Sequence, residues 1–220
     1  MDTFRTEEEQ VEAIKSWWKN NGISTVTTIA IAIALVVGWR GWQDRQVENA
    51  AAASSLYQNV FEVDQKIEQQ GSEEDYATAN HLTEQLKENH EDSAYARYAV
   101  LLKAKRDAEQ GDLAAAEAEL QWALAHSDGG LLTEQDLPLQ DLLQLRLAKV
   151  LLAQEKFDEA KIALTVVEAK QFVALAQELE GDILFAQGDK QQAKQQYQKA
   201  LDNQDRTAST EVLRIKMSNL

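Results

Sequence analysis

The chain has 220 residues, a formal net charge of −15, no cysteine and one proline, Pro138. The absence of cysteine excludes a disulfide framework and a cysteine nucleophile, and it is compatible with either side of a membrane. Residues 40–220 carry 32 acidic and 19 basic side chains, a net charge of −13. Such a domain repels phosphate groups, so we expect no nucleic-acid partner. The charge fits simple solubility as well as a mild preference for basic or neutral clients.

The window from residue 20 to residue 39 contains no charged side chain; Trp17 and Trp18 precede it, and Trp39 and Trp42 lie at its end and just beyond it. At about 1.5 Å of rise per residue, Trp17 and Trp39 lie roughly 33 Å apart along a helix, which matches a hydrocarbon core of about 30 Å. Aromatic and basic side chains suit the two interfacial layers. We therefore predict a membrane-spanning helix over residues 20–42, with the anchor residues Trp17, Trp18, Lys19, Trp39, Arg40 and Trp42.

The apolar segment is not typical of a cleaved signal peptide, which has a short basic leader and a small-residue cleavage site directly after the apolar run. Here the leader is long and mostly acidic, and the alanine-rich stretch Ala50–Ala53 follows a charged segment. Three basic residues precede the window and two follow it closely. By the positive-inside rule, this small excess favours residues 1–19 as a cytoplasmic tail and residues 43–220 as a periplasmic domain.

The remaining domain is dominated by Ala, Gln, Leu, Glu and Lys, and no segment shows the alternating β-branched pattern of a strand. This composition predicts an all-α domain that is long enough for one sizeable core. Glycines and polar breaks delimit the expected helices. Their predicted ranges are 43–70, 73–89, 94–110, 113–126, 138–154, 157–168, 172–187, 190–203 and 209–218, and the first can continue directly out of the membrane-spanning helix.

Helix pairs repeat toward the C-terminal end of the chain. Residues Glu180–Leu201 read EGDILFAQGDKQQAKQQYQKAL, which has the tetratricopeptide pattern, and Leu145–Leu164 repeats it. Corresponding alanines of the two units are 33 residues apart, about one repeat. Small residues let paired helices approach closely, and Tyr197 fills the space beside them. The small positions are Gly181, Ala193 and Ala200 in one unit and Ala148 and Ala160 in the other.

A third copy lies around Gly111 and fits the pattern in its second helix. In its first helix the same register fits poorly, because it places Lys103 and Asp107 at usually buried positions. An insertion of about ten residues within His126–Leu137 follows, and a fourth copy before Asn89 has a weaker pattern. We predict an α-solenoid of three to four helix pairs, closed by a C-terminal capping helix over residues 211–220.

A stack of helix pairs has a concave surface lined by the first helices, and such surfaces bind extended or helical peptide segments. The repeat register places eight residues of two first helices on this surface. Apolar members would anchor a bound chain and charged members would form a polar rim, which suits weak, sequence-tolerant capture. The candidate partner-binding residues are Leu142, Leu145, Lys149, Leu152, Leu175, Glu178, Asp182 and Phe185.

The sequence lacks the residue patterns that carry catalysis or hold a cofactor. The three histidines are scattered and have no metal-ligand spacing. Carboxylates mostly alternate with Lys or Gln on predicted solvent faces, and serine-nucleophile and glycine-rich nucleotide motifs are missing. We therefore expect no catalytic site, metal, cofactor or small-molecule substrate, and we interpret the domain as one for protein recognition.

Three stretches outside the repeats carry a resemblance to a known family: the leader ending QVEAIKSWWKNNG, the helix exit GWRGWQ followed by AAAASSLYQNV, and the terminus LRIKMSNL. With the repeats, the chain resembles the YfgM family of ancillary SecYEG translocon subunits over essentially its whole length. The resemblance implies a type II inner-membrane protein whose periplasmic domain associates with the SecYEG translocon and with the membrane-anchored chaperone PpiD. It also implies that the domain assists unfolded proteins as they emerge in the periplasm.

Two other functions stay open on the sequence alone. One is a periplasmic scaffold for another envelope assembly machine, which differs from the first reading only in its partner. The other is a protein of inverted orientation whose repeats lie in the cytoplasm and regulate a signalling partner, for example in a stress response. The small excess of basic residues before the apolar window argues against this inverted orientation, but only weakly.

Overall fold

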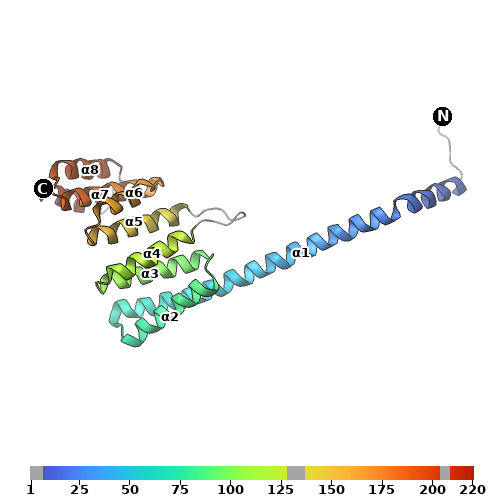
Figure 1. Ribbon diagram of the computed structural model, residues 1–220, viewed down its shortest axis with the longest axis horizontal. Coiled ribbons are helices and arrows are strands. Elements are labelled where there is room, and N and C mark those ends of the chain that lie inside the picture. The colour runs from blue at the N-terminus through green and yellow to red at the C-terminus, as the bar shows by residue number, and fades with distance from the viewer. Residues whose placement is uncertain (1–6, 128–136, 204–208) are drawn as a thin grey trace. The chain divides into compact units, whose positions relative to one another are not determined.

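The computed structural model describes residues 7–127, 137–203 and 209–220, and every regular element within these ranges is an α-helix. The chain forms two compact units, Met1–Ala51 and Ala52–Leu220, whose boundary falls within α1. The helices are α1 (Glu7–Gln70), α2 (Glu73–Asn89), α3 (Ala94–Glu109), α4 (Leu113–Ala125), α5 (Leu137–Ala153), α6 (Phe157–Thr165), α7 (Lys170–Ala186), α8 (Lys190–Asn203) and α9 (Ser209–Ser218), and Figure 1 labels the first eight of them.

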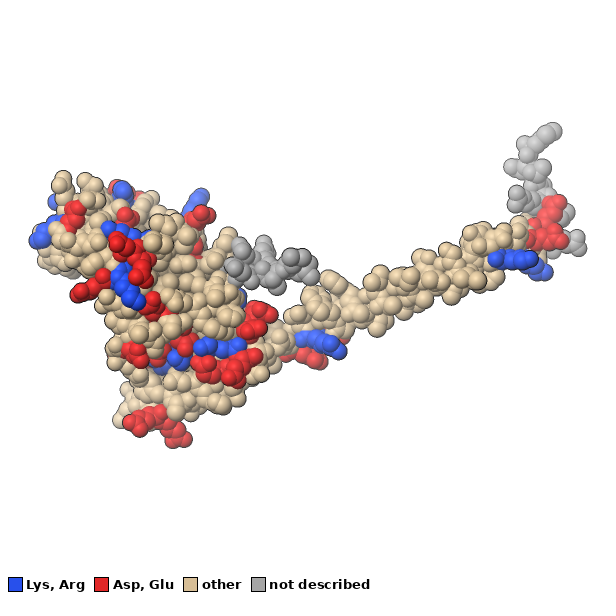
Figure 2. Space-filling model, viewed as in Figure 1, with Lys and Arg blue, Asp and Glu red and all other residues tan. Residues whose placement is uncertain are grey.

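The first unit contains the predicted membrane-spanning segment. Among the described residues, α1 is the one helix long and apolar enough to cross a membrane, with a mean hydropathy of 2.0 over its most apolar stretch. A long part of this helix carries no charged side chain (Figure 2). The hydroxyls of Thr27 and Thr28 donate to the carbonyl oxygens of Ile23 and Ser24 at 2.8 and 2.9 Å. Their donors are therefore satisfied within the helix, as a lipid environment requires.

The leader is helical from Glu7 onward, although the sequence analysis assigned it no helix. Between Glu7 and Gly22 it contains good helix formers and no proline or glycine. Glu9 lies in its first turn, where an acidic side chain favours the positive end of the helix dipole. Local sequence thus explains why the helix begins well before the apolar window.

The helix pairs α3/α4, α5/α6 and α7/α8 of the second unit share one turn geometry (Figure 1). In each turn a glutamine follows the first helix, and the next residue has a left-handed backbone: Gly111 with φ 85°, Glu155 with φ 61° and Gly188 with φ 87°. The residue after it donates its N–H to the carbonyl five residues earlier, which satisfies a free carbonyl at the helix end. These bonds are Asp112 to Asp107 at 2.8 Å, Lys156 to Leu151 at 2.9 Å and Asp189 to Leu184 at 2.9 Å.

The turn between α5 and α6 has the same backbone geometry, although it lacks the glycine and the aspartate of the other two turns. Glu155 is the non-glycine residue in the left-handed region among the described residues. Asp112 and Asp189 cap the following helices by accepting backbone N–H bonds at 3.0 and 2.9 Å. Lys156, at the corresponding position, makes no side-chain cap.

Small residues allow the close approach of paired helices that the repeat pattern predicts. Ala160, Ala193 and Ala200 are fully buried. At Gly181, an added Cβ would lie only 2.4 Å from the ring of Tyr197, which is 2% exposed. The largest apolar cluster joins α3 to α7 and includes Val100, Leu120, Leu143, Leu151, Leu164 and Ile183.

Paired charges are buried where α3 packs against α4. Lys103 lies 3.0 Å from Asp107 and 3.0 Å from Glu119, and Lys87 of α2 lies 2.9 Å from the same Glu119. Lys103 and Asp107 thus occupy the largely buried positions to which the repeat register assigned them, and each charge has a partner inside the stack. Burial alone would lower the pKa of Lys103, but hydrogen bonds to Glu119 and Asp107 outweigh it and raise the pKa above its ordinary value.

A second buried ion pair joins the end of α1 to α3. Nη1 of Arg106 lies 2.6 Å from Oδ1 of Asp64, with the two side chains 4% and 6% exposed. An apolar cluster beside it contains Val60 of α1 and Leu86 of α2, so these helices pack on α3 through both kinds of contact. Four carboxylates, Asp64, Asp107, Glu119 and Asp141, are buried and so depart from the solvent-facing position predicted for most of them.

The C-terminal helix α9 covers the end of the stack, which confirms the predicted cap. Its Leu213 is fully buried in a cluster with Leu184, Ala193 and Tyr197. Of the insertion predicted at His126–Leu137, residues 128–136 lie outside the described part of the chain.

Candidate functional site

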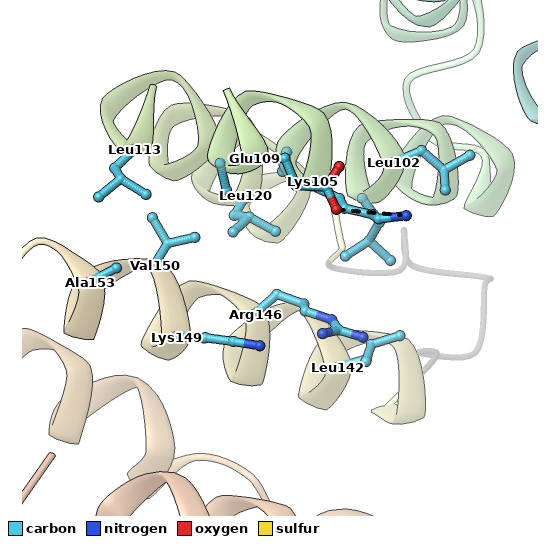
Figure 3. Close-up of a pocket in the computed structure, with 13 residues that line it drawn as sticks. Leu102, Lys105, Glu109, Leu113, Leu120, Leu142, Arg146, Lys149, Val150 and Ala153 are labelled. Atoms are coloured by element: carbon cyan, nitrogen blue, oxygen red, sulfur yellow. Dashed lines mark ion pairs between the residues drawn. The ribbon is translucent and has the colours of Figure 1, made fainter. Parts of the chain in front are cut away.

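A cavity of about 650 Å³ lies between α3 and α4 on one side and α5 on the other. Figure 3 shows Leu113 and Leu120 of α4 pointing toward α5, with Arg146 in the space between the helices. The apolar lining includes Leu101, Leu102, Leu142 and Val150. The cavity is thus bounded largely by first helices of the repeats, as expected for a concave face.

A second cavity of about 270 Å³ lies between α5, α7 and the capping helix α9. It shares Leu142, Arg146 and Lys149 with the larger cavity. Because the two cavities adjoin along α5, we refer to them together as the groove.

Six of the eight predicted partner-binding residues line the smaller cavity, and two do not. Leu152 packs against the large apolar cluster, and Phe185 is exposed near the end of α7 without lining either cavity. Leu145 is only 7% exposed, so its side chain forms the floor more than the open surface. The six residues are Leu142, Leu145, Lys149, Leu175, Glu178 and Asp182.

The two acidic residues of this set are already engaged by the capping helix. Nζ of Lys216 lies 2.7 Å from Oε1 of Glu178 and 2.7 Å from Oδ2 of Asp182. The hydroxyl of Tyr197 also donates to Asp182, at 2.8 Å. These carboxylates therefore form an internal cluster that fixes α9 to α7, in addition to bordering the cavity.

Burial and hydrogen bonding set the protonation of this cluster. Burial alone would lower the pKa of Lys216, but hydrogen bonds to Asp182 and Glu178 outweigh it and raise the pKa above its ordinary value. Burial raises the pKa of Tyr197, and its hydrogen bond to Asp182 raises it further. Lys216 is consequently charged and Tyr197 neutral at physiological pH.

Four charged groups of the groove were not predicted from the sequence. Arg146 lines both cavities, Lys105 and Glu109 line the larger one, and Lys216 lines the smaller. Arg146 follows Leu142 by one helical turn, so helical spacing could have identified it. The position of Lys216 depends on how α9 docks, which spacing within one helix does not reveal.

The predicted membrane anchors lie on the exposed surface of the first unit. Trp17 and Trp18 have ring centroids 6.2 Å apart, and those of Trp39 and Trp42 lie 5.1 Å apart. All four rings are between 45% and 61% exposed. Lys19 and Arg40 are exposed as well. This arrangement suits interfacial aromatic belts with neighbouring basic side chains.

Within the described ranges, no group of three or more His, Asp or Glu side chains is placed to hold a metal ion. His90 and His126 are the residues that terminate α2 and α4, and the ring of His126 stacks on Trp122 with centroids 4.2 Å apart. The described chemistry of the groove is accordingly that of apolar contact and charge pairing.

The chain matches the family described as "Tetratricopeptide repeat-like domain" over residues 15–220. It is 33% identical over 216 residues to a protein of Haemophilus influenzae named "Ancillary SecYEG translocon subunit", with 97% of each chain covered. The chain belongs to the family of ancillary SecYEG translocon subunits. A protein of the same name from Escherichia coli is 28% identical over 222 residues, covering 100% of this chain and 99% of the relative. No solved structure matches significantly.

Membership of the ancillary SecYEG translocon subunit family confirms the resemblance inferred from the leader, helix exit and terminus. The helical repeats in the structure and the repeat-like family match agree on the fold. The relatives' name and the repeat-like family description both point to an ancillary subunit.

Proposed function

We propose that this protein is a non-enzymatic inner-membrane adaptor that associates with the SecYEG translocon. In this proposal it is a single-pass type II protein: residues 1–19 are cytoplasmic, residues 20–42 span the membrane and residues 43–220 lie in the periplasm. Its groove binds partner proteins, including the chaperone PpiD and unfolded periplasmic proteins that emerge from the translocon.

The observation that carries this proposal is similarity over nearly the full length to relatives named as translocon subunits. Because the similarity includes the apolar helix as well as the repeats, it supports a role that needs both parts. The groove supports polypeptide binding, since it combines leucines with charged groups along neighbouring first helices.

The orientation is tested by fusing a reporter after Leu220. Alkaline phosphatase folds to its active form in the periplasm, so we expect an active fusion there and an inactive cytoplasmic reporter at the same position. The reverse pattern would show that the repeats lie in the cytoplasm, and it would favour the alternative of a cytoplasmic signalling regulator.

Polypeptide binding by the groove is tested with a photo-crosslinking amino acid at Leu175 in intact cells. Leu175 is 44% exposed and lines the smaller cavity. Ile162 of α6 is the matched control, because it is 66% exposed and lines neither cavity. We expect severalfold more adduct from the probe at Leu175, with translocon subunits, PpiD or secreted proteins identified by mass spectrometry.

Equal yields at Leu175 and Ile162 in a folded protein would contradict the groove as the binding surface. Adducts that contain only components of another envelope machine would favour the scaffold alternative. The two outcomes are distinguishable, because the first concerns the position of the contact and the second its partner.

A further inference from the structure

Two cations in the middle of the groove have no partner in the described part of the protein. Arg146 and Lys149 are exposed, lie one helical turn apart on α5 and line both cavities. Neither forms an ion pair or hydrogen bond with another described residue. They carry two positive charges within a chain whose net charge is −15.

The remaining charges that line the groove are paired. Lys105 pairs with Glu68 of α1. Its Nζ also lies 3.9 Å from Oε1 of Glu109, and the dashed line in Figure 3 marks this second pair. At the other end, Lys216 holds Glu178 and Asp182. The acidic residues of the groove are therefore occupied, and the unsatisfied charge is positive.

Leucines surround the two free cations. Leu102 of α3 lines the larger cavity with them, Leu142 precedes Arg146 by one turn on α5, and the exposed Leu175 of α7 lines the smaller cavity. A ligand that covers these leucines must also cover Arg146 and Lys149. Covering a cation without a counter-charge carries a desolvation penalty, whereas a carboxylate offsets that penalty by pairing with it.

We propose that the groove selects polypeptide segments in which acidic side chains lie between leucine-like apolar residues. This inference rests on the proposed function, because it specifies the chemistry of the chain that the groove binds. The guanidinium of Arg146 can hold a carboxylate through two hydrogen bonds, and Lys149 adds a second charge one turn away. A basic segment meets repulsion at the same place, so the preference of the groove is opposite to that expected from net charge alone.

The test uses the full chain in nanodiscs of phosphatidylcholine, which present no net anionic surface. The probe is a fluorescein-labelled peptide of sequence Leu-Glu-Glu-Leu-Leu-Asp-Glu-Leu, compared with its amide analogue, in which Gln and Asn replace Glu and Asp. By fluorescence anisotropy we expect the acidic peptide to bind about tenfold more tightly than the amide analogue, and the difference to shrink as salt is raised.

Two double variants decide whether Arg146 and Lys149 cause the tighter binding of the acidic peptide. Arg146→Gln with Lys149→Gln is expected to weaken the acidic peptide about tenfold, to the level of the amide analogue, and to leave the analogue unchanged. Lys194→Gln with Lys199→Gln removes the same charge from exposed positions on α8 that line neither cavity, and is expected to change nothing. Unaltered circular dichroism establishes that each variant is folded.

Equal binding of the acidic and amide peptides would overturn the inference and leave the groove as a nonselective binding surface. An acidic peptide with glycine in place of every leucine gives a second check. If it binds as tightly as the leucine-containing one, simple attraction to charge explains the binding and the inference also fails. Absence of binding by every peptide would overturn it too, while crosslinking at Leu175 reports separately on the proposed function.

Discussion

Replacing Asp64 by asparagine is expected to lower the free energy of unfolding by about 3–5 kcal/mol, the range found when one partner of a buried ion pair is removed. The substitution keeps the shape of the side chain but leaves the guanidinium of Arg106 buried without a counter-charge. Nε of Arg106 has no hydrogen-bond partner in the described structure, and Nη2 has only a 3.4 Å contact with Asn80. Chemical unfolding of the full chain in detergent, followed by circular dichroism, measures the effect.

The exposed pair of α9 is the matched control for Asp64. Arg214 and Glu211 lie 3.8 Å apart with side chains 69% and 72% exposed. Because exposed pairs contribute about 0–1 kcal/mol, Glu211→Gln is expected to leave the unfolding midpoint nearly unchanged. A loss of under about 1 kcal/mol for Asp64→Asn would mean that water reaches Arg106 and that the pair is not closed in solution.

Adding a single methyl group at Gly181 is expected to destabilise the repeats by about 1–3 kcal/mol, the usual range for overpacking. In an unobstructed helix, glycine to alanine stabilises by roughly 1 kcal/mol, so the sign of the effect is informative. At Gly181 the new Cβ would lie 2.4 and 2.5 Å from atoms of the Tyr197 ring, which is held between the helices. Thermal unfolding of Gly181→Ala against the unmodified chain measures the change.

Two companion variants locate the origin of that effect. Gly41→Ala makes the same change in a helix where the new Cβ meets nothing within 4 Å, so no loss is expected there. When Tyr197 is first replaced by alanine, Gly181→Ala is expected to become neutral or stabilising, because the obstructing ring is gone. A loss that persists in the Tyr197→Ala background would place the strain in the backbone.

Much of the helical architecture follows from local sequence. The turn residues after α3 and α7 end one helix and cap the next, so the sequence places these boundaries to within a residue or two. The last turn of α6 was predicted to reach residue 168 but ends at Thr165. There Asp141 of α5 accepts the backbone N–H groups of Glu168 and Ala169 at 3.1 and 2.7 Å, an interaction that local sequence does not reveal.

Charge pairing across the stack was the harder part to predict. Asp64 and Arg106 are 42 residues apart, and nothing near either residue identifies the other. Most carboxylates were therefore interpreted as solvent-facing, which is the usual case for charged side chains. The same limit applies to the groove: the register located residues on α5 and α7, whereas Lys216 reaches the groove through the docking of a separate helix.

Glu155 shows that the turns of this array are preserved in conformation more strictly than in residue type. Its left-handed backbone matches Gly111 and Gly188, although a side chain there costs roughly 1 kcal/mol. A protein tolerates such a local cost while its total stability remains above the level that its function requires. Consequently, a repeat search that demands glycine at every turn would find the α3/α4 and α7/α8 pairs and miss the α5/α6 pair between them. A comparison of backbone dihedral angles would identify three equivalent turns, at Gly111, Glu155 and Gly188.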